Sequence, residues 1–179
     1  NSEAKPGPKL SAAGLRIGVV VSRFNARITD RLRKGALEAL KTAGATDAQM
    51  DIVDVPGAFE IPLTAKRLAE AKKVDAVIAI GCVLRGETDH YNYVCSEVAR
   101  GVQLAQLDTG VPIIFCVLTC ESDDQALERS GGKLGNKGYD AGLAAIEMAT
   151  FMRRNPRKVI AASAAPKKDR AKSKARGRK

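Results

Sequence analysis

Short runs of β-branched residues alternate with amphipathic segments along this chain of 179 residues, and this alternation limits its fold more than any other feature. Apolar runs rich in Val and Ile predict strands at residues 15–21, 50–55, 74–82 and 111–118. Apolar side chains three or four positions apart predict helices at residues 28–43, 58–71, 90–108, 124–129 and 139–154. This order predicts an α/β domain with one four-stranded parallel sheet and helices on both of its faces.

The composition favours a folded protein that lies away from membranes and holds no metal. Apolar residues make up 45% of the chain and aromatic residues only 4%, so we expect a core of Val, Ile, Leu and Ala. No apolar run is long enough for a transmembrane helix, and residues 1–14 lack the apolar stretch of an uncleaved signal peptide. Four Cys without a C-x-x-C pair, and a single His, predict buried thiols in a reducing cytoplasm and no zinc site.

Positive charge is concentrated at one end of the chain. Residues 153–179 contain 12 Lys and Arg residues and one Asp, whereas residues 1–152 contain 18 basic and 19 acidic residues. We expect a flexible segment at 1–13, a folded domain at 14–155 and a basic disordered tail at 156–179, because the tail has too few apolar residues to fold. Two interpretations of the tail stay open: a solvated extension, or a contact with a polyanion such as nucleic acid or an acidic protein surface.

Parallel connections place every strand-to-helix loop at the carboxyl edge of the sheet, where such folds bind ligands. The loop at residues 83–90 leads into a helix N-terminus, which favours an anion such as phosphate, and it contains Gly86 and the hydroxyl of Thr88. Glu87 and Asp89 oppose an anion unless they point away, and an ordinary capped helix start looks much the same. The loop therefore indicates a phosphate site without establishing one.

Four side chains at this edge have both a functional and a structural interpretation. His90 is suited to proton transfer near neutral pH, although a lone His is more often structural. Phe24 and Phe59 each follow a strand, and they either stack on a flat heterocycle or pack against the next helix. Glu60 either complements a helix dipole or accepts hydrogen bonds from ligand hydroxyls. No dinucleotide fingerprint, P-loop or G-x-S-x-G elbow is present, which argues against the enzyme classes that use them.

Five segments, in order along the chain, closely resemble one enzyme family. They are GVVVSRFN at 18–25, VPGAFEIP at 55–62, GCVLRGETDHY at 81–91, FCVLT at 115–119 and GGKLGNKG at 131–138. The family that these segments resemble is lumazine synthase, and the resemblance covers about residues 14–152. It implies a transferase that condenses 5-amino-6-(D-ribitylamino)uracil with (S)-3,4-dihydroxy-2-butanone 4-phosphate. This condensation is the penultimate step of riboflavin biosynthesis, and the family carries it out without a metal or other cofactor.

The resemblance also implies a fold and an assembly. The expected fold is a flavodoxin-like three-layer α/β/α sandwich, and the expected assembly is a pentamer whose active sites lie between neighbouring subunits. The compact loop at 131–138 favours an icosahedral shell of twelve pentamers, with riboflavin synthase as an expected partner. Two other hypotheses stay open: a paralogue that binds riboflavin or lumazine with poor turnover, and a shell whose basic tail recruits cargo.

The resemblance to lumazine synthase also implies which residues of this chain form the active site. Those expected around the ribitylaminouracil substrate are Phe24, Ala58, Phe59, Glu60, Cys82, Val83, Leu84, Phe115 and Lys137. Those expected at the phosphate are Glu87, Thr88 and Arg129, and His90 is the expected proton-transfer residue. The adjacent subunit is expected to supply Phe115, Arg129 and Lys137. Cys82 and Cys116 depart from the family, which commonly has Thr and Gly there, and the basic tail lies beyond the usual family end.

Overall fold

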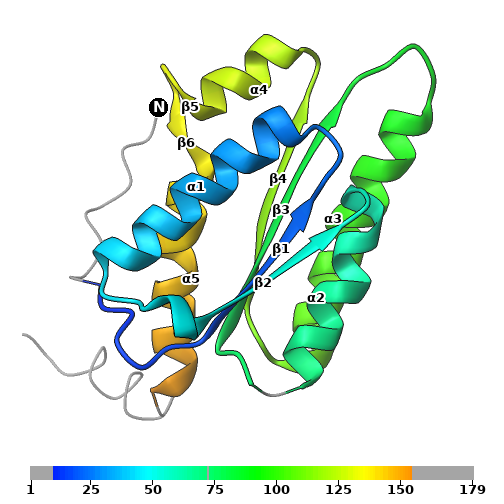
Figure 1. Cartoon of the computed structure of the whole chain (residues 1–179). Coiled ribbons are helices and arrows are strands. Elements are labelled where there is room, and N and C mark those ends of the chain that lie inside the picture. Colours follow the sequence, from blue (N-terminus) through cyan, green and yellow to red (C-terminus); the bar gives the residue numbers. More distant parts are fainter. Residues whose placement is uncertain (1–9, 72, 155–179) are drawn as a thin grey trace, which may run out of the picture.

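The computed structural model describes residues 10–71 and 73–154 (Figure 1). Most of the predicted flexible segment at 1–13 and the whole predicted tail at 156–179 therefore lie outside the described residues. The four main strands are β1 (Ile17–Ser22), β2 (Met50–Val55), β3 (Ala76–Leu84) and β4 (Ile113–Cys120). The α-helices are α1 (Ala26–Thr42), α2 (Ile61–Glu70), α3 (His90–Thr109), α4 (Asp123–Arg129) and α5 (Lys137–Arg153). None of the described helices has the length and apolar character needed to cross a membrane.

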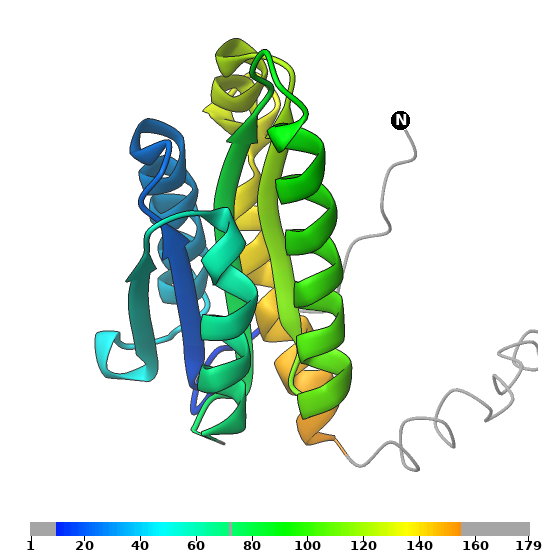
Figure 2. The same cartoon turned by 90° about the vertical axis from the view of Figure 1, so that its right-hand side faces the viewer.

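One sheet with strand order β2-β1-β3-β4 forms the middle layer, and all of its pairings are parallel. Helices α1 and α5 cover one face, and α2 and α3 cover the other, as the two perpendicular views show (Figures 1 and 2). The predicted α/β architecture with a four-stranded parallel sheet is confirmed, and its strand order is that of flavodoxin-like folds.

Two apolar cores lie on the two faces of the sheet, because successive side chains of a strand point in opposite directions. In β1, Val19 and Val21 belong to the core under α1 and α5, whereas Val20 belongs to the core under α2 and α3. In β3, Ile78 and Val77 divide in the same way. A strand that is buried on both faces has to be apolar throughout, which explains the continuous Val and Ile runs of the sequence.

The structure differs from the sequence prediction at the strand ends and in one glycine-rich loop. Strands β3 and β4 each begin and end two residues later than predicted, because Val74 is buried without being part of the parallel ladder, which begins at Ala76. Residues expected in the second helix form a 3-10 turn, η2 (Ala58–Glu60), and another 3-10 turn, η1 (Asp47–Gln49), precedes β2. The loop after α4 contains a small antiparallel hairpin, β5 (Ser130–Gly132) and β6 (Gly135–Asn136).

Candidate active site

A cavity of about 700 Å³ lies at the carboxyl edge of the sheet, next to the point where β1 and β3 diverge. The last pair between these strands is Val21 with Ile80, whereas β3 stays paired with β4 as far as Leu84. Residues 81–84 therefore have no partner strand on their β1 side. Helices α1 and α2, which follow the neighbouring strands β1 and β2, leave to opposite faces of the sheet (Figure 1). Such a divergence is where α/β sheets hold their ligands, and the volume suits a small molecule.

Three strand-to-helix loops and the first turns of α3 line this cavity. The lining residues are Phe24, Pro56, Gly57, Ala58, Phe59, Glu60, Cys82, Val83, Leu84, Gly86, Thr88, His90, Tyr91, Tyr93 and Val94. Nine of the predicted site residues, from Phe24 to His90, are among them. The structure thus brings together in one place residues that are up to 66 positions apart, counted from 24 to 90.

The two aromatic rings of the first two loops are exposed at the cavity. Phe24 is 69% and Phe59 is 58% exposed, although both are large and apolar. A ring that fastened the next helix to the core would be buried, so this exposure favours the stacking interpretation over the structural one.

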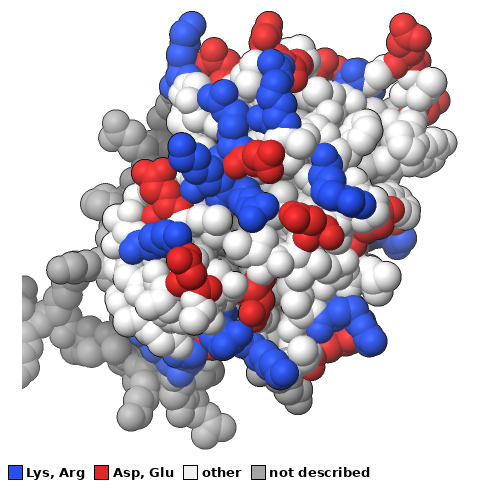
Figure 3. Space-filling model, in the orientation of Figure 1, with Lys and Arg blue, Asp and Glu red and all other residues white. Residues whose placement is uncertain are grey.

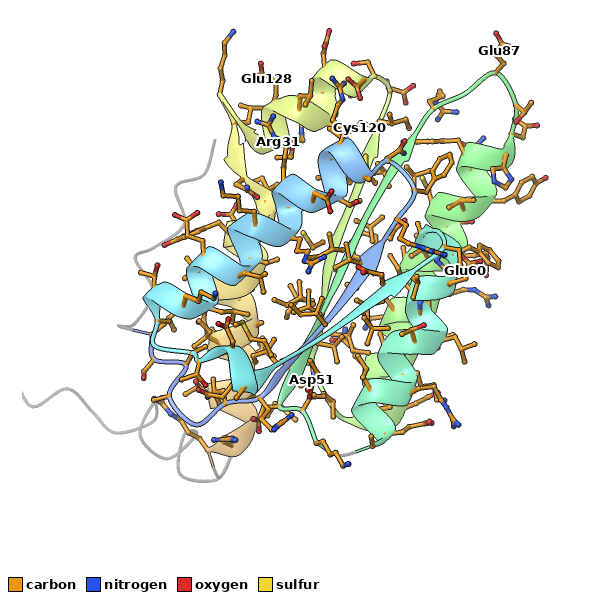
Figure 4. All side chains as sticks on the ribbon, in the orientation of Figure 1. Arg31, Asp51, Glu60, Glu87, Cys120 and Glu128 are labelled. Carbon is orange, nitrogen blue, oxygen red and sulfur yellow. The ribbon has the colours of Figure 1, made fainter. Side chains whose placement is uncertain are left out.

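The polar groups of the cavity come from η2 and from the start of α3. The Glu60 carboxylate lies beside Gly57, where an added Cβ would be 3.1 Å from Oε2, so a side chain at position 57 would press on it. Figure 4 shows Glu60 between the end of β2 and α3. His90 is the first residue of α3 and is exposed, and Gly86 and Thr88 precede it in the lining. A helix of 20 residues thus has its positive dipole end at the cavity.

Four predicted residues, all within the described part of the chain, do not line the cavity. Glu87 lies at the outer tip of the loop between β3 and α3, with its side chain directed outward (Figure 4). Arg129 ends α4 and donates a hydrogen bond of 2.9 Å to the carbonyl oxygen of Gln125. Lys137 begins α5, and Phe115, 44% exposed, lies on the edge strand β4.

With this geometry in place, comparison with known families is decisive. The model of the family described as 6,7-dimethyl-8-ribityllumazine synthase matches residues 14–153.

The chain belongs to the lumazine synthase family.

The match runs from the residues before β1 to the end of α5 and includes every loop that lines the cavity. Lumazine synthases are transferases of riboflavin biosynthesis, and membership assigns this activity to the chain.

The thiols of this lumazine synthase family member are poor nucleophiles at neutral pH. Burial raises the pKa of Cys82 to about 12, and burial likewise raises the pKa of Cys116 to about 12. Burial also raises the pKa of Cys95 and of Cys120. A protonated thiol neither attacks a carbonyl nor binds a metal well, so Cys82 contributes its backbone and its volume to the cavity. Within residues 10–71 and 73–154, no group of three or more His, Cys, Asp or Glu side chains is arranged to hold a metal ion.

Sequence reasoning assigned no role to several residues that line or support this cavity. Tyr91, Tyr93 and Val94 line it from the first turns of α3. Asn25 does not line it, but its side-chain amide donates a hydrogen bond to the carbonyl oxygen of Cys82, which does. Asn25 was visible in the first matched segment, and its position immediately before a helix was the available signal. Tyr91 was likewise visible at the end of the third matched segment. Tyr93 and Val94 gave no separate signal, because aromatic and apolar residues at the start of a helix are as typical of packing as of binding.

Proposed function

We propose that this cavity binds 5-amino-6-(D-ribitylamino)uracil next to (S)-3,4-dihydroxy-2-butanone 4-phosphate and condenses them to 6,7-dimethyl-8-ribityllumazine. The observation that carries the proposal is the meeting of two exposed Phe rings, a carboxylate, a His and a helix N-terminus around one space of about 700 Å³. Phe24 stacks on the pyrimidine ring. Ala58, Phe59 and Glu60 hold its edge and the ribityl hydroxyls, and the backbone of residues 82–84 meets the ring from the side of the sheet.

The phosphate binds at the start of α3. The backbone N–H groups of Gly86 and Glu87, the Thr88 hydroxyl and the helix dipole together provide donors and positive potential for an anion. The outward direction of the Glu87 side chain supports this arrangement, because it keeps a carboxylate away from the bound phosphate (Figure 4).

The reaction needs proton transfer and positioning more than it needs a nucleophilic side chain. The amine of the uracil attacks the ketone, and the tetrahedral adduct loses water to give an imine. Loss of the proton from the neighbouring carbon then expels phosphate and leaves an enol, which tautomerises to a ketone. The ribitylamino nitrogen attacks this ketone, and loss of a second water closes the new ring. His90 carries protons to and from the reacting nitrogen and oxygen atoms, while the cavity holds the two substrates in register.

The remaining binding groups come from a neighbouring subunit. The family is generally oligomeric. Arg129, Lys137 and Phe115 lie on or beside β4, at the far edge of the sheet from β2, and none of them lines the cavity of its own chain. When two subunits meet, the exposed Phe and the two cations beside β4 of one subunit would complete the cavity of its neighbour. We propose a pentamer joined in this way, assembled into an icosahedral shell of twelve pentamers in the cytoplasm, with riboflavin synthase as a partner.

Residues 156–179 contact a polyanion, either nucleic acid or an acidic protein surface, because they are rich in Lys and Arg. The folded domain does not share this charge excess: on the face that Figure 3 shows, basic and acidic side chains are interspersed. Fluorescence anisotropy of a labelled oligonucleotide, titrated with the full chain at increasing salt, tests this contact. Binding that weakens steeply with salt supports it, and no binding at about 50 mM salt would exclude nucleic acid as the polyanion.

The condensation itself is tested by following the lumazine chromophore when both substrates are mixed with the full-length protein. A rate far above that of a protein-free mixture, lost on Arg129→Ala, supports the proposed reaction and its phosphate site. Tight riboflavin or lumazine binding without acceleration would instead favour a binding protein of the same fold.

A further inference from the structure

The segment that carries the proposed phosphate donors has few anchors of its own. Arg85 still belongs to the sheet edge, because its backbone N–H donates to the carbonyl oxygen of Cys120 at 3.0 Å. Gly86, Glu87 and Thr88 are exposed and make no hydrogen bond to any residue that the structure describes. Three consecutive residues without such bonds would be free to move, and ordering them on binding would weaken affinity.

The Arg85 side chain makes contacts on both sides of this segment. Its Nε lies 2.7 Å from Oε2 of Glu121, which follows β4. Its Nη2 donates to Oδ1 of Asn92 at 3.3 Å, and its guanidinium lies 4.1 Å from the centre of the Tyr91 ring. Tyr91 and Asn92 both belong to the first turn of α3. One planar cation therefore connects the end of β3, the end of β4 and the start of α3, and the rigid fork of a guanidinium suits these simultaneous contacts better than an ammonium does.

Arg85 acts from outside the cavity. Leu84, Gly86, Thr88 and Tyr91 line the cavity, whereas Arg85 does not. The guanidinium instead lies against Glu121, Asn92 and the ring of Tyr91.

We propose that Arg85, held by Glu121 and stacked on Tyr91, is a positioning residue that fixes residues 86–88 in the conformation that binds the substrate's phosphate. This inference rests on the proposed function for the identity of the substrate, but the ordering of the loop does not depend on it. Fixing the loop before binding removes an entropic cost that would otherwise be set against phosphate affinity. The effect is expected in the binding of the phosphate-bearing substrate, and much less in that of the uracil.

The alternative is that Arg85 swings into the cavity and binds the phosphate itself. Glu121 separates the two ideas. If Arg85 is a positioning residue, Glu121→Gln removes one of its charged partners, so residues 86–88 become less ordered and phosphate binding weakens. If Arg85 is a phosphate ligand that Glu121 restrains, the same change frees the guanidinium and strengthens binding.

The test compares Arg85→Gln, Arg85→Lys and Glu121→Gln in the full chain, with Arg16→Gln as the matched control. Arg16 is also a half-exposed arginine paired with a carboxylate, that of Asp51, but it precedes β1 at the opposite edge of the sheet. Arg85→Gln and Glu121→Gln should each raise KM for the phosphate-bearing substrate about fivefold, with kcat and KM for the uracil changed less than about twofold. Arg85→Lys should fall between them and the wild type.

A second readout does not require turnover. Amide hydrogen exchange at residues 86–89 in the presence of inorganic phosphate should be slowed in the wild type and in Arg16→Gln, and slowed less in Arg85→Gln and Glu121→Gln. Equal exchange and equal KM in the wild type and all of the variants would overturn the proposal, as would a lower KM in Glu121→Gln. A wild-type protein without turnover would refute the proposed function alone, because the exchange measurement would still show whether Arg85 orders residues 86–88.

Discussion

The side-chain amide of Asn25 donates a hydrogen bond of 2.9 Å to the carbonyl oxygen of Cys82. It thereby joins the end of β1 to the part of β3 that has no strand neighbour on that side. Asn25 is also the single non-glycine residue with a positive φ, 58°, among the residues that the structure describes. The left-handed backbone turns the chain into α1 and leaves the preceding Phe24 ring exposed at the cavity. Asn25 thus helps to position both the Cys82 backbone and the Phe24 ring at the proposed site.

Substitutions at Asn25 should separate its two roles. Asn25→Gly keeps the left-handed backbone without strain, but it loses the hydrogen bond and makes the unfolded chain more flexible, which together should lower the free energy of unfolding by about 1–2 kcal/mol. Asn25→Ala loses the bond and also has to adopt the left-handed conformation with a Cβ, which should lower the free energy of unfolding by about 1 kcal/mol more than loss of the bond alone. Urea unfolding of the three proteins measures both differences. Equal stability of the Gly and Ala variants would show that the cost of the left-handed backbone does not exceed the entropic cost of glycine.

Removing the Phe24 ring should affect binding and leave stability almost unchanged. The ring is 69% exposed, so Phe24→Ala should change the free energy of unfolding by less than about 0.5 kcal/mol. Loss of stacking should raise KM for the ribitylaminouracil substrate about tenfold. Leu107→Ala is a matched control, because Leu107 is 68% exposed near the far end of α3. Similar KM values for the two variants would contradict the assignment of Phe24 to the substrate.

A site shared between subunits predicts complementation between two inactive proteins. His90→Ala should lower kcat about 100-fold through lost proton transfer, and Arg129→Ala should lower activity through lost phosphate binding. After the two variants are unfolded, mixed equally and refolded together, about a quarter of the sites should combine an intact His90 with an intact neighbouring Arg129. Activity in the mixture should therefore rise to about a quarter of the wild-type value. Activity no higher than the average of the separate variants would mean that both residues act within one chain.

The buried thiols predict a loss of stability at alkaline pH. In the folded protein the pKa of Cys82 and of Cys116 is raised to about 12, from an ordinary value of 9.0. Above pH 9 the unfolded chain releases these protons while the folded chain keeps them, so the unfolded state is favoured as pH rises. Each thiol should lower the free energy of unfolding by up to about 1.4 kcal/mol per pH unit in this range.

Guanidinium unfolding at pH 7.5 and pH 10 measures this loss against a variant that carries both Cys82→Ala and Cys116→Ala. The variant should be less stable at pH 7.5 but should lose less stability on going to the higher pH. An identical loss in both proteins would show that the thiols do not ionise differently in the folded and unfolded states.

The sheet and its two helix layers were predictable, because a strand buried on both faces has to be apolar along its length. The same rule misplaced the strand ends: Val74 is as apolar as the strand that follows it, but pairing begins only where β1 begins, at Ile17. The β5–β6 hairpin had no signal in hydrophobic pattern. It depends on Gly131 and Gly135, which adopt φ values of 112° and 77° that most residues avoid.

The site was predictable as far as it lies on loops at the carboxyl edge of the sheet. Strand order decides which loops meet, and the alternation of elements does not determine strand order. The contact between Arg85 and Glu121 illustrates the limit, because it depends on β3 and β4 being neighbours and ending side by side. Similarly, the placement of Arg129 and Lys137 outside the cavity of their own chain follows only from the positions of α4 and α5 in three dimensions.

Whether the cavity beside β1 and β3 forms lumazine can be decided by one optical measurement. The full-length protein is mixed with both substrates, and the lumazine absorbance is followed beside a protein-free mixture, since the condensation also proceeds slowly unaided. We expect saturable formation of lumazine far above the unaided rate, greatly slowed by His90→Ala and Arg129→Ala while both variants remain folded. Lumazine formation no faster than in the protein-free mixture would contradict this expectation.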